Sequence, residues 1–348
     1  MNKVTFLCLI VLIISCSNKK TEQLTETRLI EEYPVNISDK ETEQVTETQF
    51  IEEYPVNISE VMKDETFKIL DDTVLKVEQL RNNTLKIVDY LGNDKNIVIP
   101  SVLYNLPITS IGNEAFYNKG LISVIMPNSV IEIERYFTGA GYDGAFAKNN
   151  ITFLALSKGL INIGSGAFYG NKNLGTVTIP DSTINIGDNA FYDCGLISVY
   201  FGSKVQSIGS GSFAFNMIEN IDLPSSLREI GDEAFRNSQF AKAIIPNGVV
   251  NVGGNAFPKS VVEVVIPPSL ANYDSNISRG NIAGFQGAFE NPENLTRITL
   301  PANVDDRNFS IRDWSFSPGF ETGFRNYYIN QNKKAGTYVK NGSIWNLE

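Results

Sequence analysis

The chain has 348 residues, of which 42% are apolar and 20% charged, and its formal net charge is −10 at pH 7. This composition supplies enough apolar side chains for a core and excludes a chain that is disordered throughout. The sequence contains no histidine. Its absence excludes the Ser-His-Asp triad, the Cys-His pair and every metal site with histidine ligands.

Residues 1–16 have the features of an export signal. Lys3 gives a positive start, and an apolar run follows at residues 4–14. This run is too short to cross a bilayer, which needs about 20 residues, so we predict a cleaved signal peptide rather than a membrane helix. The sequence "IISC" at its end resembles the bacterial lipobox, which predicts lipidation at Cys16 and a lipid anchor in the membrane. An ordinary signal peptide with an unrelated cysteine is the alternative.

Residues 17–65 form an acidic segment with an internal duplication. "TEQLTETRLIEEYPVNIS" (21–38) recurs as "TEQVTETQFIEEYPVNIS" (42–59), and the segment carries 13 acidic and 5 basic side chains. A stretch so charged and so poor in core-forming residues is expected to be a disordered tether, spanning roughly 40 Å as a random coil. The alternative is that "IEEYPVNIS" is a docking peptide in two copies. A duplicated spacer is the interpretation that we prefer from the sequence.

A unit of 22 or 23 residues then recurs between residues 95 and 316. Two steps are longer, because residues are inserted at 134–144 and 272–287. In most units a short apolar alternation ends in proline, and an Ile-Gly pair precedes the aligned phenylalanine. The aligned phenylalanines are Phe116, Phe146, Phe168, Phe191, Phe213, Phe235, Phe257 and Phe289.

One unit shows how the pattern should fold. An apolar alternation with a period of two predicts a strand, proline ends it, and the glycine is expected to permit a sharp turn. Leu174, Val177 and Ile179 should face a core, whereas Thr176 and Thr178 should face away from it. A unit of this length cannot bury its apolar face alone, so neighbouring units must stack, with the phenylalanines forming a spine. The predicted fold class is a β-rich solenoid.

The consensus "LxxVxIPxxVxxIGxxAFxxC" is similar to the BspA-type bacterial leucine-rich repeat, found in surface proteins of anaerobic oral and gut bacteria and of spirochaetes. The resemblance covers some two-thirds of the chain. Departures are Ser157 and Gly202 in place of proline, the two insertions, and a ninth unit without Ile-Gly before Trp314. The resemblance implies a right-handed leucine-rich-repeat array of about nine units. It also implies adhesion or other protein–protein contact by a lipoprotein at the cell surface or outer membrane, which we expect to be a monomer.

The open ends of such an array need covers. Residues 66–94 predict an N-terminal cap, and residues 317–348 predict a C-terminal cap with a β-hairpin at Asn341-Gly342. The aromatic side chains of this terminus are expected to stack on the last unit, and carbohydrate binding is the alternative. They are Tyr327, Tyr328, Tyr338 and Trp345.

Catalysis is not expected. Glu114, Asp188, Asp232 and Glu233 follow the Ile-Gly of their units, where other units carry Gly, Ser or Asn. This recurrence favours solvent-facing turns over the paired carboxylates of a hydrolase. Cys194 takes a position held elsewhere by asparagine or small residues, so we expect a buried apolar role rather than a reactive thiol.

Cofactors, metals and nucleic acid are also not expected. No glycine motif that could cradle a phosphate follows a suitable strand and precedes a helix. Residues 66–348 carry 23 basic and 26 acidic side chains. With no basic stripe, this balance argues against nucleic acid as a partner.

The candidate binding surface is the concave sheet face of the array. The two residues that flank the middle apolar position of each strand should face away from the core and form one continuous face. Exposed apolar residues in one column of this face would mark a contact surface for a protein or other macromolecule, although the strand propensity of branched and aromatic residues is an alternative explanation. The candidate contact residues are Val98, Ile125, Phe153, Thr178, Tyr200, Asp222, Ile244 and Val265.

Two further alternatives concern the location of binding and the function itself. The inserted loops at 134–144 and 272–287 are expected on one edge, roughly 29 Å apart by strand spacing, so they could carry recognition in place of the sheet face. A structural envelope or spacer protein with no specific ligand is the second candidate function. A carboxylate-based enzyme is the third.

Overall fold

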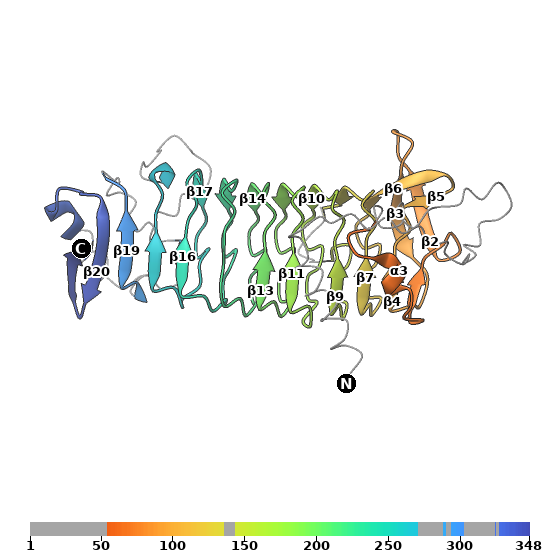
Figure 1. The fold of residues 1–348 in the computed structure, drawn as a ribbon, viewed down its shortest axis with the longest axis horizontal. Helices are drawn as coiled ribbons and strands as arrows, with labels where there is room; N and C mark the ends of the chain where they lie inside the picture. Colours follow the sequence, from red (N-terminus) through yellow and green to blue (C-terminus); the bar gives the residue numbers. More distant parts are fainter. Residues whose placement is uncertain (1–53, 136–142, 271–287, 290–293, 303–323, 325–326) are drawn as a thin grey trace, which may run out of the picture.

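The computed structural model describes residues 54–135, 143–270, 288–289, 294–302, 324 and 327–348. The described chain forms an elongated array in which the strands of successive units lie side by side along the long axis (Figure 1). Most strand pairs in the array are parallel. None of the helices among the described residues has the length and apolar character needed to cross a bilayer.

One side of the array carries three- and four-residue strands whose side chains form what we call the sheet face. Within the described residues these strands pair in parallel as β4-β7-β9, β11-β13 and β16-β18-β19. Equivalent positions of neighbouring units stand opposite each other, as Val98 and Ile125 do. The strands are β4 (Asn96–Val98), β7 (Ser123–Ile125), β9 (Phe153–Ala155), β11 (Thr176–Thr178), β13 (Ser198–Tyr200), β16 (Lys242–Ile244), β18 (Glu263–Val265) and β19 (Arg297–Leu300).

The predicted strands are confirmed at these positions, with one exception. No strand forms at Asn220–Asp222, although the unit has the expected apolar spacing. Asn and Asp are depleted in strands, and here they stand on both sides of Ile221. In the unit at 174–179 the predicted orientation is confirmed, because Val177 is buried while its two threonine neighbours are exposed.

A second ladder of two-residue strands runs beside the first and continues through β6, β3 and β2 near the N-terminal end. Each of these short strands ends on the buried residue of the Ile-Gly or Val-Gly pair, or its equivalent. The short strands are β8 (Glu132–Ile133), β10 (Asn162–Ile163), β12 (Asn185–Ile186), β14 (Ser207–Ile208), β15 (Glu229–Ile230) and β17 (Asn251–Val252).

The glycine that follows every short strand except β8 has a different role from the predicted one. Gly187 and Gly209 are not among the residues with positive φ, so no unusual backbone conformation requires glycine there. A Cβ at either position would lie 2.6 Å from a backbone nitrogen of the preceding unit. Glycine is therefore needed because adjacent coils approach closely, and not to permit the turn.

The aligned phenylalanines form the predicted spine. Ring centroids of successive residues from Phe116 to Phe235 are 4.8 to 5.6 Å apart, and the rings are nearly parallel. The stack continues through Phe257 to Phe289 at 6.3 and 5.2 Å. All eight rings are buried. The spine prediction is confirmed, and it explains why the phenylalanine is the most regular residue of the repeat.

The N-terminal end of the described chain departs from the expected tether. Tyr54, Ile58 and Val61 are buried, and the last two are the first and last residues of a short helix, α3 (Ile58–Val61). The prediction of a disordered tether over residues 17–65 is therefore wrong from residue 54 onward. Residues 1–53, which include Cys16 and the first copy of the duplication, lie outside the described residues.

Further strands complete this end of the array. β1 (Phe67–Ile69) pairs in parallel with β4 and so extends the sheet face by one strand. β2 (Leu75–Gln79) and β3 (Leu85–Tyr90) form an antiparallel pair, and β3 joins β6 (Leu106–Ile111) in parallel. β5 (Val102–Leu103) pairs antiparallel with β6.

The C-terminal end closes on an antiparallel hairpin. β20 (Gly336–Asn341) pairs with β19 and with β21 (Ile344–Leu347), and the turn consists of Gly342 and Ser343, one residue later than the predicted Asn341-Gly342. Tyr328, Tyr338 and Trp345 are buried around Phe324, whose ring centroid is 4.6 Å from that of Trp345. This burial leaves little ring surface on these residues for a carbohydrate.

A 3-10 turn, η1 (Pro268–Leu270), follows directly after β18. Residues 136–142 and 271–287 lie outside the described residues, and with them most of both inserted loops. The predicted position of these loops on one edge therefore stays a prediction.

Candidate functional site

The candidate contact residues fall into two groups on the sheet face. Val98 and Ile125 are 0% exposed, so the expectation that they face solvent is wrong. Phe153 is half-buried beside them. They do point away from the phenylalanine core, as predicted, but they belong to a second apolar cluster on the outside of the sheet.

This second cluster exists because residues 54–62, which we call the docked segment, cover the sheet face over β1, β4, β7 and β9. Tyr54, Ile58 and Val61 of the segment pack with Val98 and Ile125, and Ala155 and Phe67 complete the cluster. α3 lies against these strands at the N-terminal end of the array (Figure 1). The chain thus already buries part of the predicted binding surface with its own polypeptide.

One hydrogen bond joins the docked segment to the array, and another stabilises the short helix within it. The Tyr54 hydroxyl donates to the carbonyl oxygen of Ile99 at 3.2 Å, just beyond the end of β4. Asn57 caps α3, since its Oδ1 accepts from the backbone nitrogen of Glu60 at 3.3 Å. A capping asparagine satisfies one of the free N–H groups of the first helical turn. The contact therefore combines apolar burial with directional bonds.

The sheet face beyond β9 is uncovered by any described residue. Tyr200 on β13 is 61% exposed and Ile244 on β16 is 55% exposed. Thr178 and Asp222 are also exposed, and Val265 is half-buried. Exposed apolar side chains in a column of this kind are frequent at protein contact surfaces.

A charged row runs beside this apolar column. On β16, β18 and β19, Lys242 pairs with Glu263 at 2.8 Å, and Arg297 lies 3.9 Å from the same carboxylate. Arg297 also pairs with Glu348 at 2.8 Å. These exposed pairs contribute little stability. They leave a surface with an apolar column next to alternating charges, which suits a polypeptide better than a uniformly charged polymer.

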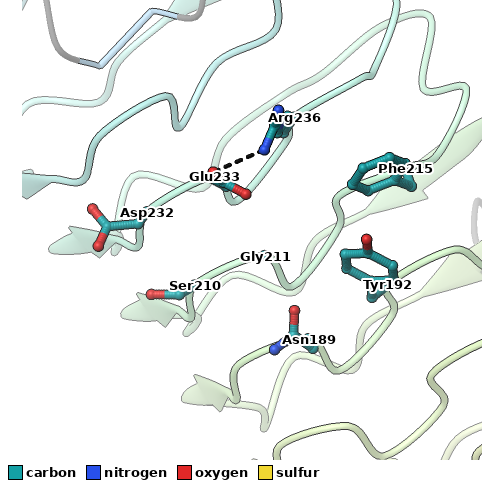
Figure 2. Close-up of a pocket in the computed structure, with 8 residues that line it drawn as sticks. All are labelled: Asn189, Tyr192, Ser210, Gly211, Phe215, Asp232, Glu233 and Arg236. Carbon is teal, nitrogen blue, oxygen red and sulfur yellow. Dashed lines mark hydrogen bonds and ion pairs between the residues drawn. The ribbon is translucent and has the colours of Figure 1, made fainter. Parts of the chain in front are cut away.

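A shallow hollow of about 360 Å³ lies on a different part of the array, among the turns that precede and follow the spine phenylalanines. Figure 2 shows Tyr192 beside Phe215 on one side, and Arg236 directed at Glu233 on the other, at 2.9 Å. Asn189, Ser210, Gly211 and Asp232 complete the lining.

The aromatic side chains of this hollow do not offer a platform for a sugar ring. Tyr169 and Tyr192 stack at 5.0 Å, Tyr192 and Phe215 lie 4.9 Å apart, and Arg236 stands over the next face of Phe215. Ring faces thus cover one another, and mainly ring edges meet solvent.

The acidic side chains around the hollow serve the turns. Asp188 Oδ1 accepts from the backbone nitrogen of Ser210 at 2.7 Å, and Asp232 Oδ1 accepts from that of Gly254 at 2.6 Å. Each carboxylate therefore bonds to the equivalent turn of the next unit.

Backbone conformation explains the variety of residues at one of these positions. Glu114 and Glu233 stand two residues before their phenylalanines and have φ of 60° and 56°. Asn189 has the same left-handed conformation at the equivalent position, as do Gly166 and Gly211. The position favours Gly or Asn. The two glutamates are consequently turn residues held in an unfavourable conformation.

The expectation that Cys194 is buried is confirmed. Cys194 is 0% exposed, and its Sγ lies 3.1 Å from the carbonyl oxygen of Phe168. Burial raises the pKa of the thiol to about 12. At the equivalent position Asn171 and Asn216 bond to the backbone of adjacent units instead. Within the described residues, no three Cys, Asp or Glu side chains gather as a metal site.

The parallel ladders and the repeated unit define a leucine-rich-repeat protein. The model for the BspA type leucine rich repeat region matches residues 88–138 and 142–263, in six copies. The chain belongs to this family. Proteins that carry this repeat have a protein-interaction or structural role.

Several solved structures are similar in fold. A leucine rich cell surface protein from Faecalibacterium prausnitzii A2-165 is 23% identical, with a TM-score of 0.39 over 56% of this chain and 53% of that one. The T. pallidum Leucine Rich Repeat protein is 20% identical, with a TM-score of 0.33 over 66% and 81%. The pneumococcal vaccine antigen PcpA is 14% identical, with a TM-score of 0.33 over 70% and 91%. This chain thus spans about half the length of the first of these proteins. No curated protein sequence matches the chain.

Sequence reasoning missed the docked segment. Its signal was present, because Tyr54, Ile58 and Val61 follow a helical spacing and Asn57 stands at a capping position. The high charge of residues 17–65 as a whole obscured this short apolar pattern.

Proposed function

We propose that this chain is located at the surface of a bacterial cell and binds a protein of a host or of another bacterium. The contact is made by the uncovered part of the sheet face, between Thr178 and Val265. The observation that supports this proposal is the docked segment, since the same face already holds a polypeptide over β4 and β7. Tyr200 would be the main anchor, because tyrosine is enriched among the few residues that supply most of the binding energy of a contact surface, and Ile244 would add apolar contact area beside it.

The rest of the arrangement belongs to the same proposal. Cys16 carries the lipid, and the acidic residues that follow it separate the repeats from the membrane. The repeats form a right-handed solenoid of about nine units with a cover at each end. The protein is a monomer that adheres to a host or bacterial macromolecule.

The test of the binding surface uses fluorescently labelled protein, residues 17–348, applied to intact epithelial cells. Tyr200→Ser with Ile244→Ser should reduce cell binding at least about tenfold without loss of folding. The matched control is Ile131→Ser with Val250→Ser, since both side chains are exposed but precede the short strands β8 and β17. Equal binding by the wild type and the sheet-face variant would contradict the proposal.

Loop deletions distinguish binding by the sheet face from binding by the inserted loops. If the sheet-face variant keeps full affinity, and deletion of residues 139–144 or 276–284 abolishes it, the inserted loops carry recognition and the sheet face is scaffold.

The location has its own test. Protease treatment of intact cells should degrade the protein, whereas survival until the envelope is broken would remove the premise of adhesion.

Cys16→Ser should abolish labelling with a radioactive fatty acid and release the protein from the membrane fraction. Unchanged detergent partitioning of this variant would contradict the lipid anchor.

A further inference from the structure

The hexapeptide at the centre of the docked segment occurs twice in the chain. Residues 54–59 read Tyr-Pro-Val-Asn-Ile-Ser, and residues 33–38 have the identical sequence. In the docked copy Tyr54 and Ile58 are buried, Val56 packs against the same cluster, and Asn57 caps α3. Every side chain of the hexapeptide that makes the contact is therefore present in the first copy as well.

The two copies differ in the residues that follow. Val61 and Met62 pack in the cluster, whereas the equivalent positions of the first copy are Lys40 and Glu41. Lysine and glutamate are costly to bury without partners, so the first copy binds more weakly.

The first copy is also farther from the site along the chain. From Ser38 to Phe67 there are 28 intervening residues (39–66), compared with 7 (60–66) from Ser59. Effective concentration falls roughly as the −3/2 power of linker length, which is about an eightfold disadvantage for the fourfold longer linker. Both differences favour residues 54–59 in the undisturbed chain, in agreement with the observed docking.

We propose that residues 33–38 are the second occupant of the site formed by Val98, Ile125 and Ala155, and that they take it when residues 54–59 leave. A partner that captures residues 54–62 then leaves no apolar patch exposed to water. When residues 33–38 replace residues 54–59, the chain that precedes the docked hexapeptide becomes 21 residues shorter. This corresponds to a contour length of about 70 Å. Any change in the distance between the repeats and a membrane rests on the lipid anchor of the proposed function, whereas the exchange of the two copies does not rest on it.

Amide hydrogen exchange on the full chain tests this proposal. The amides of Glu60, Val61 and Met62 are hydrogen-bonded in the docked copy, and their counterparts are residues 39–41. In the wild type, exchange should be slow at residues 60–62 and fast at residues 39–41.

The variant that empties the site is Tyr54→Asp with Ile58→Asp, because it puts two charges where side chains are 3% and 1% exposed. Residues 60–62 should lose their protection, and exchange at residues 39–41 should slow at least about fivefold. Adding Tyr33→Asp with Ile37→Asp should abolish this new protection. Fast exchange at residues 39–41 in the first variant, with the amides of β10, β12 and β14 still protected, would overturn the proposal.

Two further variants sharpen the result. Tyr33→Asp with Ile37→Asp alone is the matched control and should leave residues 60–62 protected. Lys40→Val with Glu41→Met, added to the site-emptying variant, should increase protection at residues 39–41 because it restores the two apolar contacts. No increase would argue against a shared site. These measurements need no external ligand and leave Tyr200 and Ile244 unchanged, so their failure is distinguishable from failure of the proposed function.

Discussion

The two ends of the sheet face have the same backbone and opposite exposure. Ile125 on β7 and Ile244 on β16 hold the same position in their units, yet the first is 0% and the second 55% exposed. Residues 54–62 lie outside the repeats and pack in one cluster with Ile125, together with Phe67 and Phe153, whereas Ile244 belongs to neither apolar cluster. A regular array thus acquires two different surfaces from one short segment.

This comparison changes how exposed apolar residues in a repeat should be interpreted. An isoleucine at the outer position of a strand is expected from strand propensity alone. At the covered end the same residue type forms a contact with a polypeptide. The covered end thus shows that this outer position packs against another segment of the same chain.

The largest expected effect would break the scaffold that both ends share. Phe191→Ala removes a buried ring stacked between Phe168 and Phe213, and should reduce the free energy of unfolding by about 3 to 5 kcal/mol. Chemical denaturation measures this loss. Tyr192→Ala is the control, because this half-buried neighbour lies outside the spine. A loss below roughly 1 kcal/mol for Phe191→Ala would contradict the role of the spine.

The second prediction measures the difference between the ends directly. Ile125→Ser should cost about 2 to 4 kcal/mol, since it leaves a cavity and a hydroxyl beneath the docked segment. Ile244→Ser should change stability by no more than about 0.5 kcal/mol. Thermal and chemical denaturation of both variants provide the comparison. Equal losses would mean that residues 54–62 do not cover β7 in solution.

A third prediction asks whether the two ends differ anywhere except on the sheet face. Glu114→Gly and Glu233→Gly should each stabilise the protein by about 0.5 to 1 kcal/mol, because glycine adopts the left-handed conformation without strain. Glu114 lies near the covered end and Glu233 near the uncovered end. Similar gains in the free energy of unfolding would confine the difference to the sheet face, and a loss at either position would contradict the assignment of strain.

The smallest expected effect concerns Cys194. Because burial raises the pKa of its thiol to about 12, a thiol reagent should not label the folded protein near pH 8 and should label the unfolded protein fully. The stability associated with the neutral thiol is present below the unfolded pKa, near 9, and is lost as pH rises towards the folded value. Rapid labelling of the folded protein would contradict this prediction, because it would show that the core around Cys194 opens to solvent.

Much of the repeat was predictable from the sequence because each of its features is local. The period-two alternation places Val177 inward and Thr178 outward without reference to the rest of the chain. The recurrence of phenylalanine every 22 or 23 residues required neighbours to stack, and the rings do stack. The role of Gly187 was not predictable in the same way, because the backbone that it approaches belongs to the preceding unit.

The sequence by itself determined the leucine-rich-repeat fold, most strands of the sheet face and the identity of the core, because hydrophobic periodicity and side-chain volume are properties of each unit. Only the tertiary structure decided that Val98 and Ile125 are covered while Tyr200 and Ile244 are exposed. Those four residues have the same local pattern. Their difference depends on where residues 54–62 reach after folding. The pattern of this segment indicates a short apolar face, but it does not say which strands that face will cover, and Val98 and Ile125 lie 36 to 71 residues further along the chain.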